Sequence, residues 1–185
     1  MATRESDSGG DGVLDQRDTY AYDGDRNMLT RERDSGADGT VDDRWTYAYD
    51  GDGNMLTEEF DEGADGTVNS SNTLTYDAEG NVLTLEEDDG ADGVRRYSYT
   101  YDANGNMLTM EQDAGVDGTV DERITWTYDA DGNMLTLEHD SDGDGTLDER
   151  ISYSYDANGN LQLDERDDGA DGTVDSTYTY TYGEC

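Results

Sequence analysis

The chain has 185 residues, enough for one ordinary domain or one short repeat array. It carries 48 Asp and Glu residues against 11 basic residues, all of them arginine, and its net charge at pH 7 is −37. Such a polyanion repels nucleic acids and anionic membrane surfaces, which leaves polycations and metal ions as natural partners. No apolar run is long enough to span a membrane, and residues 1–7 lack the apolar core of a signal peptide.

Hydrophobic residues make up only 31% of the chain, a proportion also found in disordered proteins. The 14 tyrosines and 2 tryptophans nevertheless fall at regular positions, and proline, which is common in disordered acidic chains, is absent. We therefore expect an ordered protein in which something offsets the repulsion between carboxylates.

A Tyr-Asp pair recurs through the chain at a step of 27 residues, shortened once to 25 by a two-residue deletion near Val94. Its tyrosines are Tyr22, Tyr49, Tyr76, Tyr101, Tyr128 and Tyr155, and Tyr182 continues the series. The step predicts a single repeat array over residues 1–185. Its hairpin units span residues 7–33, 34–60, 61–87, 88–112, 113–139 and 140–166, with a partial unit at 167–185.

Each unit has the pattern loop, strand, tight turn, strand. In the fifth unit, apolar and polar residues alternate up to Tyr128, which is typical of a pleated strand. The segment Asp129–Asn133 then fits a hairpin turn, and Met134–Leu137 forms the second strand. The predicted fold is all-β: a tandem antiparallel β-hairpin array of about 27 residues per unit. It would be solenoid-like or an extended sheet, and able to polymerise.

The turn type decides which side chains share a face. A three-residue turn closed by a left-handed glycine places Tyr128 opposite Met134 and Thr127 opposite Leu135. Tyrosines and leucines would then lie on opposite faces, each covered at least in part. A four-residue loop would instead place them on one face.

The loops between hairpins hold Asp residues at offsets of four and eight, and the sixth loop holds one more at offset two. Closely spaced carboxylates around a glycine bend are typical calcium ligands. The candidate ligands are Asp7, Asp11 and Asp15; Asp34, Asp38 and Asp42; Asp61, Asp65 and Asn69; Asp88 and Asp92; Asp113, Asp117 and Asp121; Asp140, Asp142, Asp144 and Asp148; and Asp167, Asp171 and Asp175.

We expect these loops to bind Ca2+ with dissociation constants on the order of 10⁻⁴ to 10⁻³ M, so that they fill outside cells. The fourth loop lacks its last ligand because of the deletion, and it is expected to be the weakest site or empty. Two simpler explanations stay open. Asp-Gly pairs also form ordinary solvated turns, and adaptation to high salt also enriches aspartate, although neither explains the spacing.

Two segments resemble known families. The segment from Tyr101 to Met107, Tyr-Asp-Ala-Asn-Gly-Asn-Met, resembles the Rhs/YD repeats, which are extracellular β-hairpin arrays of bacterial toxin shells and cell-surface proteins. The loop from Asp140 to Asp148 is similar to the calcium loops of thrombospondin type 3 and dockerin repeats. That resemblance implies side-chain ligands at positions one, three, five and nine. Ile151 stands where those families often place a further carboxylate.

Function follows from repetition. A set of residues that recurs in every unit indicates a recurring structural role, so we expect no enzyme and no catalytic residues; the lone His139 is expected to be solvated at a loop edge. The β-prone segments Thr19–Tyr22 and Ser176–Tyr182 are predicted to be free edges on which identical copies join head to tail. The main hypothesis is a calcium-stabilised extracellular fibre or cell-surface scaffold. The alternative is a carbohydrate-binding or adhesive module that grips polysaccharide with its aromatic ladder.

Overall fold

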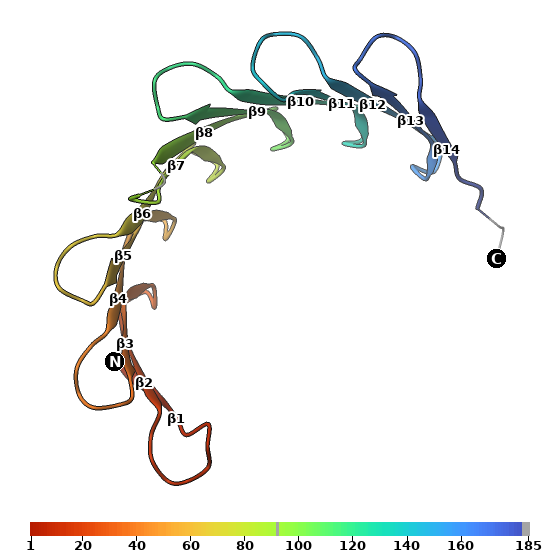
Figure 1. Cartoon of the computed structure of the whole chain (residues 1–185). Helices are drawn as coiled ribbons and strands as arrows, with labels where there is room; N and C mark the ends of the chain where they lie inside the picture. Colours follow the sequence, from red (N-terminus) through yellow and green to blue (C-terminus); the bar gives the residue numbers. More distant parts are fainter. Residues whose placement is uncertain (92, 183–185) are drawn as a thin grey trace. The chain divides into compact units, whose positions relative to one another are not determined.

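The computed structural model describes residues 1–91 and 93–182, and these residues form fourteen β-strands without a helix (Figure 1). The predicted all-β hairpin array is therefore confirmed. Accordingly, none of the described residues belongs to a helix that could serve as a membrane span. Asp92, one of the candidate calcium ligands, lies outside the described residues.

The chain divides into two compact units, of which the first comprises residues 1–94. Each of its strands pairs antiparallel with the next along the chain. These strands are β1 (Ala2–Ser6), β2 (Gln16–Tyr22), β3 (Met28–Ser35), β4 (Asp43–Tyr49), β5 (Met55–Glu62), β6 (Ser70–Tyr76) and β7 (Val82–Asp88).

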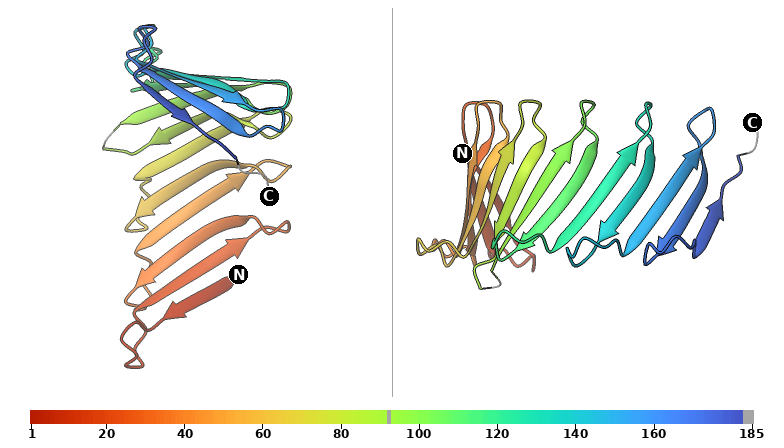
Figure 2. Two further views of the ribbon diagram at one scale, coloured as in Figure 1. Left: turned by 90° about the vertical axis from the view of Figure 1, so that its right-hand side faces the viewer. Right: turned by 90° about the horizontal axis from the view of Figure 1, so that it is seen from above.

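The second unit begins at residue 95 and has the same plan. Its strands also pair antiparallel in chain order. They are β8 (Val94–Tyr101), β9 (Met107–Ala114), β10 (Glu122–Tyr128), β11 (Met134–Asp140), β12 (Glu149–Tyr155), β13 (Leu161–Asp168) and β14 (Ser176–Thr179). Within each unit this meander places all Tyr-Asp turns at one end of the strands and all acidic loops at the other (Figure 2).

The two terminal strands differ from the expectation. The segment Thr19–Tyr22 was predicted to be a free edge, and this is wrong: β1 forms before it and pairs with β2, with Thr3 opposite Thr19 and Ala2 opposite Tyr20. The repeat step contained this signal, since Thr3-Arg4-Glu5 matches Thr30-Arg31-Glu32 27 residues later. The last strand, β14, ends at Thr179 and is shorter than the predicted segment.

A β-bulge corrects the predicted face assignment. Tyr128 lies opposite Met134 as expected, but Thr127 pairs with Thr136 because Leu135 is an extra residue in β11. The bulge shifts the register by one residue, so that Trp126 lies directly opposite Leu137. Residues directly opposite one another in a sheet share a face. The prediction that the aromatic and leucine side chains occupy opposite faces is therefore wrong.

One face of each unit is aromatic and the other is polar. On the polar face, directly paired residues form ion pairs, such as Arg44 with Glu32 (3.1 Å) and Arg123 with Glu111 (2.7 Å). Among the described residues no hydrophobic side chain is fully buried, and Tyr22 is 44% exposed. The partial cover expected for each face is therefore limited, in the described residues, to what neighbouring side chains of the same sheet provide. The strands are held by hydrogen bonds and half-buried cross-strand pairs instead of a closed core.

Candidate functional site in the acidic loops

The Tyr-Asp turns show how aspartate is used at the opposite end of the strands. Asp50 accepts hydrogen bonds from the backbone N–H of Asn54 (2.8 Å) and of Asp52 (2.9 Å), while the Asn54 amide group donates to its second oxygen (2.9 Å). These bonds, the Asn54 side-chain bond foremost, lower the pKa of Asp50. The same capping by aspartate and asparagine recurs at Asp23, Asp77, Asp102, Asp129 and Asp156.

The second loop illustrates the geometry of the acidic loops. The side chain of its first aspartate, Asp34, is buried and accepts the backbone N–H groups of Asp38 (3.0 Å) and Gly39 (2.9 Å). Asp38 in turn accepts the N–H of Thr40, and this bond leads those that lower the pKa of Asp38. The last aspartate, Asp42, closes the loop by accepting an N–H from β3. All three carboxylates therefore bind backbone donors within their own loop.

The third, fifth and seventh loops repeat this pattern. Their first aspartates each accept two backbone N–H groups, at Asp61, Asp113 and Asp167. In the third loop Asn69 takes the last position, where its Oδ1 atom accepts the Glu62 N–H at 2.7 Å. A neutral acceptor thus replaces the carboxylate there, which shows that this bond does not require a negative charge.

Successive loops are also bonded to one another. The N–H of Gly36 donates to the carbonyl of Asp15 (2.5 Å), and that of Gly63 donates to the carbonyl of Asp42 (2.6 Å). In the second unit, Gly169 makes the equivalent bond to Asp148 (2.5 Å). Each of these links ties a loop to the end of the loop before it, so the first three loops are joined in series, and the seventh is joined to the sixth.

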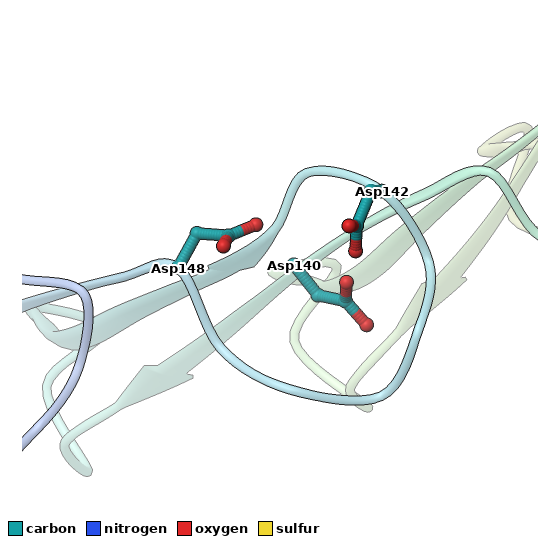
Figure 3. Close-up of side chains that lie close together, drawn as sticks. All are labelled: Asp140, Asp142 and Asp148. Atoms are coloured by element: carbon teal, nitrogen blue, oxygen red, sulfur yellow. The ribbon is translucent and has the colours of Figure 1, made fainter.

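The structure places the predicted ligands that it describes in or at the ends of the loops, but within the described part of the chain it brings only one trio together. Single oxygens of Asp140, Asp142 and Asp148 lie within 4.8 Å of one another (Figure 3). Asp144, expected as a ligand of the same loop, instead accepts the N–H of Thr146 (2.7 Å). In the fourth loop Asp88 accepts a backbone N–H, and its predicted partner Asp92 lies outside the described residues.

A buried ionic cluster in the first unit was not predicted. Asp18 is 4% exposed, and it accepts hydrogen bonds from Arg31 (3.0 Å) and Gln16 (2.6 Å). Burial alone would raise the pKa of Asp18, but these bonds and the charges of Arg31 and Arg33 outweigh it and lower the pKa. Asp18 stands 27 residues before Trp45, at a position that is apolar or aromatic in most other repeats. An acid at that position was the sequence signal from which the cluster could have been predicted.

The aromatic face continues from this cluster. Arg31 and Arg33 lie over the ring of Trp45, with 4.6 and 5.0 Å to its centroid, and Trp45 stacks on Phe60 at 4.9 Å. Both contacts are of the kind that stabilise exposed aromatic rings. Burial, followed by the charge of Glu58, raises the pKa of Tyr47 to about 12.

Two residues tie neighbouring hairpins together from the strands. The hydroxyl of Tyr76 donates to the carbonyl of Met55, and the hydroxyl of Tyr155 donates to that of Met134, both at 2.7 Å. His139 also differs from the expectation of a solvated position. It lies half-buried in β11, with Nε2 2.8 Å from the Glu122 carboxylate, where it has a structural partner.

Comparison with known proteins shows the fold. No family model and no curated protein sequence matches the chain. The crystal structure of TcdB2-TccC3 without its hypervariable C-terminal region matches with a TM-score of 0.52 at 17% identity, over 89% of this chain and 10% of that one. A second TcdB2-TccC3 crystal structure gives a TM-score of 0.48 at 15% identity, covering 86% of this chain and 11% of the other.

The Photorhabdus luminescens Tc holotoxin pore is also similar, with a TM-score of 0.45 at 15% identity over 85% of this chain and 10% of that one. This chain spans about a tenth of the length of each of these solved chains. The first of the three similarities supports the Rhs-like β-repeat fold, and at this identity it speaks only for the fold.

Proposed function

We propose that this chain is a structural scaffold element, a subunit of a fibre or of a cell-surface layer, and that it has no enzymatic role. The observation that carries the proposal is the serial bonding of the repeats. Loop bonds such as Gly36 to Asp15 and tyrosine bonds such as Tyr76 to Met55 join several of the neighbouring repeats. Stability spread along a row of similar units suits an extended load-bearing element.

Self-association at the ends of the array is part of this proposal. Among the described strands, β1 pairs only with β2 and β14 only with β13, so each has one unpaired edge. On the β14 side, Tyr178 and Tyr182 are 58% and 57% exposed. The unpaired edge of β14 is rich in tyrosine and threonine, which favours pairing with another strand. Head-to-tail pairing of identical copies is heterologous and open, and it would produce a filament.

Calcium is proposed as the stabilising ion of the loops, at the concentrations found outside cells. Support comes from the net charge of −37 and from the clustered carboxylates of the sixth loop. An ion bound among these acids would lower the repulsion that opposes a compact chain. Weak oxygen sites fill only where calcium is abundant, and we therefore place the protein at the cell exterior.

Electron microscopy of the purified chain tests the scaffold role. We expect filaments one array wide that lengthen with protein concentration. Replacing the alternate β14 residues Thr177 and Thr179 by proline removes backbone donors at the edge strand and should leave single particles. Single particles of the unmodified chain at every concentration would contradict the fibre proposal.

A second candidate function is carbohydrate binding by the aromatic face. The observation in its favour is that the rings of Trp45 and Phe60 are only half-buried. Partly exposed aromatic rings can stack on sugars. A glycan array would be read with the chain and with Trp45→Ala. Binding that the substitution abolishes would favour this function, whereas signals at background for all glycans would exclude it for the sugars tested.

A further inference from the structure

The sixth loop differs from its neighbours at the third position. In the fifth loop this position is Gly115, and the first carboxylate, Asp113, accepts the N–H groups of Asp117 and Gly118 with its two oxygens, both at 3.0 Å. The sixth loop has Asp142 at the third position. This extra carboxylate accepts the N–H of Asp144 (3.2 Å), the donor that would otherwise serve the first aspartate.

The consequence is an unpaired oxygen at the first position. Asp140 is 3% exposed, and its Oδ1 atom is buried without a hydrogen-bond partner. Its Oδ2 atom still accepts the N–H of Gly145 at 2.9 Å, which fixes the orientation of the carboxylate. A buried carboxylate oxygen without a donor is unfavourable, because it has lost its water without compensation. A bound cation supplies that compensation.

The two other acids of the loop are placed to share such a cation. One oxygen each of Asp140, Asp142 and Asp148 lies within 4.8 Å of the others, and two oxygens bound to one calcium at 2.3–2.6 Å are at most about 5 Å apart. Figure 3 shows Asp142 and Asp148 directed toward Asp140 from either side. Asp148 is held by the N–H of Ser141 (2.8 Å) and by the Ser141 hydroxyl.

The first loop is a natural comparison with glycine at the third position. It shares the left-handed glycine at the fourth position, Gly10 with φ 64° against Gly143 with φ 66°. There Asp7 accepts the N–H groups of Gly10 (2.6 Å) and Gly12 (2.9 Å), one with each oxygen. With Gly9 at the third position, both oxygens of the first carboxylate accept hydrogen bonds. The unpaired oxygen is found in the sixth loop, where the third position is Asp142.

We infer that the sixth loop is a calcium site formed by Asp140, Asp142 and Asp148, and that Asp142 is the residue that creates it. The inference rests on the proposed calcium role of the loops and assigns it to one loop. All three ligands are hard oxygen donors, which suit Ca2+. Asp142 and Asp148 are exposed, so water can complete the six to eight ligands that the ion requires. The self-capped loops need no ion for their geometry.

A calcium titration of the whole chain, followed by amide NMR and calorimetry, tests this assignment. We expect one ion per chain, with a dissociation constant on the order of 10⁻⁴ to 10⁻³ M, and shifts concentrated at Ser141, Asp142 and Gly145. Asp142→Gly should weaken binding at least tenfold while the strands form normally, since the first loop folds with glycine there. Asp121→Asn, at the last position of the fifth loop, should bind calcium like the unmodified chain.

Three outcomes would overturn the assignment. Shifts of equal size in the second and fifth loops, retained in Asp142→Gly, would mean that calcium binds the loops in general and that the wider calcium role stands. No shift in any loop at about 10 mM calcium would contradict both the site in the sixth loop and the wider calcium role. If Asp142→Gly fails to fold, the titration of the unmodified chain decides whether calcium binds at the sixth loop. Shifts concentrated outside that loop would then contradict the site. Filament formation is measured separately by microscopy, so the scaffold role can be disproved while the calcium site is confirmed.

Discussion

The two ends of the strands use the same residue in two ways. At the Tyr-Asp turns, an aspartate such as Asp50 is satisfied within five residues, largely by the asparagine of its own turn. At the loop end, an aspartate such as Asp34 caps donors four and five residues ahead, and its loop also bonds to the preceding one. The comparison teaches that regularly spaced aspartates serve mainly to accept hydrogen bonds from the backbone of their own turn or loop. Only an oxygen left over from capping, as in Asp140, indicates a ligand.

Acid is expected to destabilise the turns and the loops together, and this is the largest of the expected effects on stability. The pKa values of Asp50 at a turn and Asp38 in a loop are lowered below the ordinary 3.8, by hydrogen bonds from Asn54 and Thr40 respectively. A lowered pKa in the folded state contributes stability above pH 3.8 that is lost as the pH falls through the folded value. Loss of charge repulsion acts in the opposite direction. We expect capping to dominate, with unfolding below about pH 3.8.

Circular dichroism in the far ultraviolet, recorded from pH 7 to pH 2, measures this effect. Separate amide exchange rates for turns and loops would show whether one end opens before the other. A β signal that persists at pH 2 would mean that removing the net charge matters more than removing the caps. The two ends would then be held mainly by backbone bonds between strands.

At the loop end, the first aspartate should be the most sensitive single position. Asp61 is 8% exposed and accepts the N–H groups of Asp65 and Gly66. Asp61→Ala leaves two donors without their acceptor and should lower the free energy of unfolding by about 1–3 kcal/mol. Amide exchange at residues 65 and 66 should accelerate. Glu59→Ala, an exposed acid on the same strand, is the control, and an equal loss in both variants would disprove a specific role of capping.

At the turn end, the residue with positive φ allows a substitution in each direction. Gly53 has φ 89°, and the equivalent residue of the first turn is Arg26 with φ 76°. Gly53→Ala should lower the free energy of unfolding by about 1–2 kcal/mol, because a side chain disfavours the left-handed region. Arg26→Gly should raise it by up to about 1 kcal/mol for the same reason. Urea unfolding measures both, and changes of the same sign would rule out the conformational explanation.

The sequence predicted the repeat and not the details that decide the site. The spacing of Tyr128 and Asn133 was enough to predict hairpins, because turn chemistry and strand alternation are local. The bulge at Leu135 was not predictable, since it depends on how two strands share their hydrogen bonds. The unpaired oxygen of Asp140 depends on which carboxylate receives the Asp144 N–H, a competition that only atomic positions resolve.

The smallest expected effect distinguishes an acceptor from an ion ligand at the last loop position. Asp42 accepts the N–H of Ser35 at 2.6 Å, and Asn69 makes the equivalent bond to Glu62 at 2.7 Å. Asp42→Asn keeps the acceptor and should change the free energy of unfolding by less than about 0.5 kcal/mol, with or without calcium. Asp42→Ala removes the acceptor and should cost about 1 kcal/mol. A loss in Asp42→Asn that appears only with calcium would make this carboxylate a ligand, because charge and not hydrogen bonding is then what the substitution removes.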